Sequence, residues 1–153
     1  MVLVVDDDIM NIEVMRTLLD AQEIKCDVSF SGKQALQLIE ERTKRNTEEG
    51  VPMYKIILLD YSMPLMNGPE VATKLIHYLK LANLEKPYIC CCTAYAEASF
   101  KRHALAVGMD HFLTKPIDSE EMMSILSRLN RWLYKPNLSR EKISSNFTKK
   151  PYF

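Results

Sequence analysis

Five polar residues each end or follow a short apolar run of the sequence: Asp6, Asp7, Asp60, Thr93 and Lys115. Apolar runs without polar interruptions are typical of strands that are buried on both faces of a parallel sheet. The carboxyl ends of such strands share one edge of the sheet, which is where open α/β proteins bind ligands. We therefore expect these five side chains to meet at that edge.

The chemistry of this set points to phosphate. The three carboxylates would repel one another unless a cation lay between them. Oxygen ligands of this kind suit Mg²⁺, which binds one or two carboxylates together with waters and phosphate oxygens. Lys115 would add positive charge, and Thr93 could donate a hydrogen bond to the same oxygens. Because phosphoryl transfer depends mainly on positioning and charge stabilisation, Asp60 could act as the nucleophile and form an aspartyl phosphate.

Each of these residues also has a plainer interpretation when it is taken singly. An aspartate after a strand usually belongs to a turn or caps a helix. A threonine at the end of a strand is more often structural than catalytic, and a Lys-Pro dipeptide indicates only a turn. The joint placement at the same end of successive strands favours the chemical interpretation.

Apolar periodicity predicts strands and helices that alternate five times along the chain. The predicted strands are Val2–Val5, Lys25–Phe30, Lys55–Asp60, Pro87–Cys92 and His111–Leu113. Helical stripes lie in residues 11–21, 35–39, 71–79, 100–107 and 122–133. This alternation predicts an α/β fold, a five-stranded parallel sheet with helices on both faces.

Local signals predict where several helices begin and end. Ser31 with Gln34, and Asp118 with Glu121, have the spacing of capping boxes. The segment 40–50 carries charges of both signs and ends in glycine. We expect it to be a solvated helix end followed by a surface loop.

The totals exclude several classes of function. The 20 Lys and Arg residues balance the 20 Asp and Glu residues, so no net charge favours nucleic acid or a membrane surface. No apolar stretch reaches the roughly 18 residues of a membrane span. Cys90, Cys91 and Cys92 would alternate between the faces of a strand and cannot surround one metal ion. We expect reduced thiols and a cytoplasmic location.

With these features in place, the sequence resembles the receiver domain of two-component response regulators over about residues 2–133. The matching motifs are Val4-Val5-Asp6-Asp7, Leu58-Leu59-Asp60-Tyr61-Ser62-Met63-Pro64, Met66-Asn67-Gly68, Thr93-Ala94 and Gly108-Met109-Asp110-His111-Phe112-Leu113-Thr114-Lys115-Pro116. The resemblance implies a flavodoxin-like (βα)5 fold with strand order 2-1-3-4-5.

The resemblance also implies roles for the site residues. Asp60 would accept a phosphoryl group from a phosphohistidine on a histidine kinase or a histidine phosphotransfer protein. Asp7, Asp60 and the backbone carbonyl of Ser62 would bind Mg²⁺ directly, and Asp6 would act mainly through water. Lys115 and Thr93 would contact the phosphoryl oxygens.

A conformational switch is implied as well. Thr93 would move toward the phosphoryl group and the ring of Phe112 would follow inward. The face formed by the fourth helix, fifth strand and fifth helix would then change its affinity for a partner. The Lys115–Pro116 bond would be cis, and the bulky Tyr95 would shield the phosphoryl group and slow its hydrolysis.

Two other functions fit parts of the sequence. Asp6-Asp7-Asp8 contains the Asp-x-Asp pattern of haloacid-dehalogenase phosphatases, in which Asp6 would attack and Asp8 would act as the acid and base. That family also needs a late acidic pair, which no strand after Thr93 provides. The third interpretation is a pseudo-receiver, which binds partners without being phosphorylated.

The expected organisation is a receiver domain in residues 1–133 followed by a tail or linker in residues 134–153. We expect a monomer or weak dimer that does not bind nucleic acid or a membrane directly and does not turn over a separate substrate. The chain would be either a single-domain receiver or a segment of a hybrid sensor histidine kinase.

Overall fold

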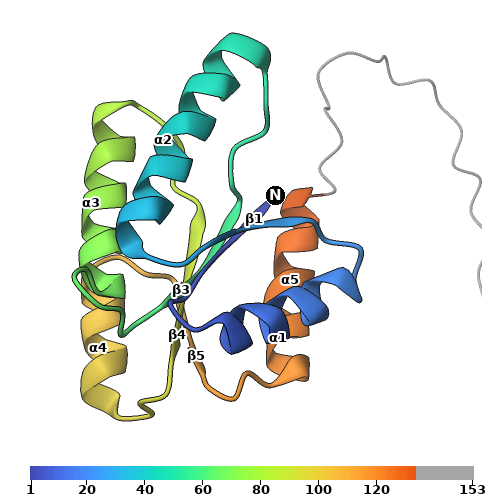
Figure 1. Ribbon diagram of the computed structural model, residues 1–153, viewed down its shortest axis with the longest axis vertical. Coiled ribbons are helices and arrows are strands. Elements are labelled where there is room, and N and C mark those ends of the chain that lie inside the picture. The colour runs from blue at the N-terminus through green and yellow to red at the C-terminus, as the bar shows by residue number, and fades with distance from the viewer. Residues whose placement is uncertain (134–153) are drawn as a thin grey trace, which may run out of the picture.

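A parallel sheet of five strands lies at the centre of the structure, a computed structural model that describes residues 1–133 and the side chains of residues 1–127 (Figure 1). The strands are β1 (Val2–Val5), β2 (Cys26–Ser29), β3 (Ile56–Asp60), β4 (Tyr88–Thr93) and β5 (His111–Thr114). The helices are α1 (Ile9–Asp20), α2 (Gly32–Glu49), α3 (Gly68–Leu81), α4 (Ala98–Ala106) and α5 (Ser119–Leu133). The strand order β2-β1-β3-β4-β5 confirms the predicted α/β fold and its topology.

The register of the strands aligns their carboxyl ends. Val5 pairs with Leu59 and Thr93 pairs with Thr114, while Asp60 at the end of β3 pairs with Cys92. Residues that follow β1, β3, β4 and β5 therefore leave the sheet at one edge, as the sequence predicts.

The helices cover the two faces of the sheet and enclose two apolar clusters. Helices α1 and α5 lie on one face, and α2, α3 and α4 lie on the other (Figure 1). Alternate residues of each strand point to opposite clusters, so Cys91 packs toward α2, α3 and α4 while Cys90 and Cys92 pack toward α1 and α5. All four cysteines are free thiols.

The segment 42–49 corrects one prediction, because it is helix rather than loop. Helix α2 continues through it to Glu49 and ends at Gly50, which adopts the left-handed conformation with a φ of 71°. Arg42 pairs with Asp27 at 3.0 Å, and the Asn46 amide donates a hydrogen bond to the Val51 carbonyl at 2.8 Å. These contacts hold the charged turns against β2 and the segment before β3, so the helix needs no apolar stripe there.

The predicted helix starts are largely confirmed. The side chains of Ser31 and Asp118 accept hydrogen bonds from the backbone of Gln34 and Glu121. The Gln34 side chain accepts from Phe30 N–H rather than from Ser31 N–H, so this first box is not reciprocal. The predicted tail, residues 134–153, lies outside the described residues. Within residues 1–133, no helix is both long and apolar enough to cross a membrane.

Candidate functional site

Asp6, Asp60 and Lys115 meet at the carboxyl edge of the sheet. Asp60 is the last residue of β3 and is 4% exposed, whereas Asp6 directly follows β1 and is fully buried. The Lys115 ammonium lies 2.5 Å from Asp6 Oδ2 and 2.5 Å from Asp60 Oδ1. The lysine therefore bridges two carboxylates that come from neighbouring strands, as the sequence predicts.

Asp7 completes an acidic group at this edge. One carboxylate oxygen from each of Asp6, Asp7 and Asp60 lies within 4.8 Å of the others, and Asp7 is exposed to solvent. A set of three carboxylates that opens to water suits a hard divalent cation that keeps several water ligands. The residues present therefore fit Mg²⁺, and one ammonium group leaves the three carboxylates with a net negative charge.

Burial changes the proton affinity of the central carboxyl and the lysine. Burial raises the pKa of Asp60, because removal of water disfavours the carboxylate; the Lys115 ammonium opposes this shift, and the charge of Asp6 adds to it. Burial disfavours the ammonium of Lys115, but its hydrogen bonds to Asp6 and Asp60 outweigh that effect and raise its pKa. Lys115 is therefore a permanent cation in the site at neutral pH.

Asp6 is held by neighbours that the sequence analysis did not single out. Its Oδ1 accepts hydrogen bonds from Asp8 N–H at 2.9 Å and from the Asn11 amide at 3.1 Å. Asn11 stands on the first turns of α1, one helical turn beyond the acidic triplet, so its spacing from Asp6 was the available signal. The Asp8 side chain caps α1 by accepting from Met10 N–H at 2.8 Å.

The loop between β3 and α3 packs tightly against Asp60. Ser62 N–H donates a hydrogen bond to Asp60 Oδ2 at 2.9 Å. A Cβ atom placed on Gly68 would lie 2.3 Å from the Asp60 carbonyl oxygen, so only glycine allows this approach. Leu65 in the same loop has a φ of 66°, a backbone conformation that is uncommon for residues other than glycine. Glycine at position 68 is thus required by the backbone around the acidic group.

Thr93 and Phe112 lie on the side of Asp60 toward β4 and β5. Thr93 ends β4, is almost fully buried, and its hydroxyl accepts a hydrogen bond from Tyr95 N–H at 3.1 Å. Phe112 is half-buried and packs against the apolar cluster under α2, α3 and α4. The Lys115–Pro116 peptide bond is cis, as the family resemblance implies.

An open cavity of about 570 Å³ lies over the acidic group. Its lining includes all three aspartates, Ser62, Thr93, Tyr95 and Lys115. The cavity is therefore lined by carboxylates, one lysine, the hydroxyl residues Ser62 and Thr93, and one tyrosine. Such a cavity can admit a phosphoryl group.

Four ring side chains, which the sequence analysis did not connect, lie beside this cavity. The rings of Tyr95 and Phe100 stack with centroids 4.8 Å apart, and Phe100 meets Tyr61 edge-to-face at 5.1 Å. The Tyr61 hydroxyl lies 2.8 Å from Nδ1 of His103 on α4. These residues come from three separate segments, so their contact could not be read from spacing.

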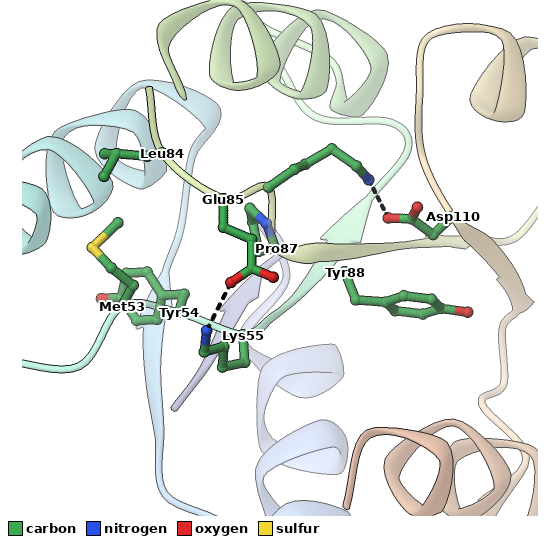
Figure 2. A pocket seen from close by; sticks show the side chains of 9 residues that line it. Met53, Tyr54, Lys55, Leu84, Glu85, Pro87, Tyr88 and Asp110 are labelled. Atoms are coloured by element: carbon green, nitrogen blue, oxygen red, sulfur yellow. Dashed lines mark hydrogen bonds and ion pairs between the residues drawn. The ribbon is translucent and has the colours of Figure 1, made fainter. Parts of the chain in front are cut away.

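A second hollow, of about 310 Å³, lies at the opposite edge of the sheet, where β3 and β4 begin (Figure 2). Its two lysines are already paired: Lys55 lies 3.3 Å from Glu85, and Lys86 contacts Asp110. Both pairs appear as dashed lines in Figure 2. Since neither cation is free there, the hollow lacks the charge that would attract a phosphoryl group.

Comparison with protein families identifies one match over most of the chain. A model of the response regulator receiver domain matches residues 2–127. The hybrid signal transduction histidine kinase I of Dictyostelium discoideum is 29% identical over 145 residues, and the histidine-protein kinase BarA of Escherichia coli K12 is 33% identical over 135 residues. These alignments cover 95% and 88% of this chain but only 8% and 13% of the kinases.

A shorter relative aligns over most of its own length. The two-component response regulator 24 of Arabidopsis thaliana is 31% identical over 128 residues, which cover 84% of this chain and 82% of that protein.

Solved structures share the same arrangement of strands and helices. The receiver domain of the histidine kinase CKI1 from Arabidopsis thaliana, complexed with Mg²⁺ and BeF3⁻, is 27% identical with a TM-score of 0.71, covering 82% of this chain and 89% of that one. The receiver domain of Ssk1 from Saccharomyces cerevisiae, solved with the histidine phosphotransfer protein Ypd1, has a TM-score of 0.76 at 20% identity, covering 90% and 92%. The likeness to Ssk1 shows the shared fold.

Proposed function

The chain belongs to the response regulator receiver domains, signalling modules with an acidic pocket typical of phosphoacceptors, and we propose that Asp60 is its phosphoacceptor. The observation that carries this proposal is the position of Asp60 on the central strand β3. Asp6 lies on one side of it, Thr93 on the other, and the Lys115 ammonium touches one of its carboxylate oxygens. No other carboxylate among the described residues has all three neighbours.

The reaction at Asp60 is a transfer of a phosphoryl group from nitrogen to oxygen. An oxygen of the Asp60 carboxylate forms a bond to phosphorus while the bond from phosphorus to the donor imidazole nitrogen breaks. The imidazole keeps the electron pair and is neutral once that nitrogen carries a proton. The Lys115 ammonium, a permanent cation, then pairs with a negatively charged phosphoryl oxygen. The Thr93 hydroxyl donates a hydrogen bond to another of these oxygens.

Asp7, Asp60 and the backbone carbonyl of Ser62 would hold Mg²⁺, with Asp6 acting through water. When bound, the ion supplies positive charge that offsets the carboxylates and the phosphoryl oxygens. The support for this assignment is the 4.8 Å grouping of the three carboxylates and the presence of Ser62 on the wall of the same cavity. Asp6 is fully buried, so contact with the ion through a bridging water suits it better than direct coordination of a hydrated ion.

Phosphorylation would be read through Thr93 and Phe112. The Thr93 hydroxyl now accepts from Tyr95 N–H, and the phosphoryl group would compete for this hydroxyl. Phe112 is half-buried against the apolar cluster, so an inward movement of its ring behind Thr93 would bury the part that is now exposed. The surface formed by α4, β5 and α5 would change as a result, because Phe112 lies on β5 and packs on the face of the sheet that α4 covers.

The phosphodonor is a histidine kinase or a histidine phosphotransfer protein. An apolar patch on α1 offers a contact for it, since Ile9, Met10 and Val14 are 58%, 68% and 50% exposed. The patch begins three residues after Asp6, so a partner seated on it would present its histidine to the cavity. The whole protein would act within a phosphorelay in the cytoplasm, as a single receiver or as a segment of a hybrid kinase, without binding nucleic acid directly.

Incubation with acetyl phosphate and Mg²⁺, followed by intact mass measurement, tests the assignment. We expect a gain of about 80 Da, one phosphoryl group on a carboxylate. The gain should require Mg²⁺ and disappear in Asp60→Asn, while Asp6→Asn should weaken it. Asp20→Asn, at the exposed end of α1, is the matched control and should be labelled normally.

Two results would overturn the proposal. Label on Asp6 would support a phosphatase-like nucleophile in its place. A folded protein that takes no label from acetyl phosphate or from a phosphohistidine protein would be a pseudo-receiver.

A further inference from the structure

Tyr95 is one of the residues that line the acidic cavity, and a ring held there would limit the approach of water to Asp60. Tyr95 lines this cavity together with Asp60 and Thr93, and its N–H donates to the Thr93 hydroxyl. About half of the residue is exposed, at 47%, so the cavity walls alone do not fix its ring. Something else must hold the ring if it is to act as a shield.

The contacts that hold this ring come from Phe100. The two rings are nearly parallel, with an interplanar angle of 13° and centroids 4.8 Å apart. Offset stacking of this kind favours the contact pair beyond the burial of apolar area. Phe100 stands on the first turn of α4 and therefore supplies a fixed support for a side chain that belongs to the preceding loop.

Phe100 is itself fixed by Tyr61, the residue that follows Asp60. The two rings meet edge-to-face at an angle of 79°, and the Tyr61 hydroxyl forms a hydrogen bond with His103 one turn further along α4. The Tyr61 N–H donates to the Cys92 carbonyl at 2.8 Å, so the base of this ring is tied to β4 beside Thr93. The three rings thus form a continuous column from the end of β3 to the margin of the cavity.

We propose that Phe100 and Tyr61 are positioning residues that set the lifetime of the phosphoryl group by holding Tyr95 over it. This inference rests on the proposed phosphorylation of Asp60. In hydrolysis a water oxygen forms a bond to phosphorus, the bond from phosphorus to the Asp60 oxygen breaks, and both water protons leave with the phosphate. Tyr95 slows this step by occupying space that the attacking water needs.

The test follows the loss of label from Asp60 after acetyl phosphate has been removed. We expect Tyr95→Ala and Phe100→Ala each to shorten the half-life of the phosphoryl group by roughly two- to tenfold. This fold-change corresponds to the free energy that one aromatic pair contributes beyond the burial of its area. The double variant should be no shorter-lived than Tyr95→Ala, because both substitutions remove the same shield. Phe100→Tyr keeps the ring and should restore the wild-type lifetime.

Leu105→Ala is the matched control, since Leu105 is exposed on the same helix and lies outside the column. Its half-life should equal that of the wild type, and thermal unfolding of every variant identifies any that fail to fold, with Phe100→Leu as the replacement for Phe100→Ala. An unchanged lifetime in a folded Phe100 variant, or additive effects in the double variant, would overturn the inference while leaving the phosphoacceptor intact. No label on wild-type Asp60 would overturn both.

Discussion

Lys115 and Asp60 show how burial and charge oppose each other at a single residue. The carboxylate loses water at the end of β3, and one ammonium shared with Asp6 compensates for that loss only in part, because the pKa of Asp60 remains above its ordinary value. Ionised Asp60 therefore lowers the free energy of unfolding at neutral pH, which is a cost to the stability of the fold. A cation or a phosphoryl group bound as proposed would reduce this cost, because either would change the charge that is buried at Asp60.

Replacement of Asp60 by asparagine should stabilise the protein at pH 7 in the absence of Mg²⁺. A carboxyl whose pKa is raised by folding contributes stability below its unfolded pKa and loses it as the pH rises through the folded value. We expect Asp60→Asn to raise the melting temperature by roughly 2–5 °C, the effect of about 1 kcal/mol in a domain of this size. Lys115 keeps Asp6 as its partner in this variant.

Thermal unfolding between pH 4 and pH 8 checks this prediction. The difference between Asp60→Asn and the wild type should shrink as the pH falls, because protonation removes the buried charge from the wild type. Asp20→Asn provides the control for loss of an exposed aspartate. A melting temperature below that of the wild type at pH 7 would show that the Lys115 contact outweighs burial.

At the scale of elements, the backbone of the β3–α3 loop determines where Asp60 lies. Gly68 begins α3 directly against the Asp60 carbonyl, and Asn67 caps the helix by accepting from Glu70 N–H at 2.9 Å. The Glu70 side chain accepts from Asn67 N–H in return, so the helix start is rigid. A side chain at position 68 would have to displace either α3 or the end of β3.

Gly68→Ala should therefore damage both the fold and the chemistry. A Cβ atom 2.3 Å from a backbone oxygen cannot be relieved by rotation of a side chain, and overpacking of this kind costs about 1–3 kcal/mol. We expect a lower midpoint of urea unfolding and slower labelling of Asp60 by acetyl phosphate. Gly50→Ala is the control, since its φ of 71° also favours glycine but nothing lies within 4 Å. That variant should lose stability without slower labelling.

The elements also show what the sequence could and could not predict. The strands β1, β3, β4 and β5 were readable because each is a short, mostly apolar run that ends in or is followed by a polar residue, and their shared edge follows from parallel pairing alone. The charged end of α2 was not readable as helix, because Arg42 is held by Asp27, fifteen residues earlier in the chain. The contact of Tyr61 with Phe100 likewise depends on side-chain packing between distant segments, which periodicity does not report.

At the scale of the whole molecule, the acidic group should couple cation binding to stability. Three carboxylates within 4.8 Å repel one another in the folded state and are separated when the chain unfolds. Binding of Mg²⁺ to the folded state alone adds about 2.7 kcal/mol at a concentration one hundred times the dissociation constant. We therefore expect the melting temperature to rise with Mg²⁺ concentration.

Thermal unfolding in a Mg²⁺ titration tests this coupling. Asp7→Asn should reduce the rise strongly, whereas Asp20→Asn should keep it. The rise should also diminish as the pH falls, since protonation of Asp60, whose pKa is raised by burial, removes one charge from the group. An equal rise in wild type and Asp7→Asn would indicate that the ion acts elsewhere.

The position of Lys115 beyond β5 has a consequence for how the protein can lose activity. β5 is an edge strand that pairs only with β4. Proteins open locally as well as globally, and edge segments can detach while central strands stay paired. Detachment of this strand would withdraw the ammonium from both carboxylates and leave β1, β3 and β4 intact. Competence for phosphotransfer would then be lost through a small local fluctuation, at a lower free energy than unfolding, and amide hydrogen exchange in residues 111–114 would report it.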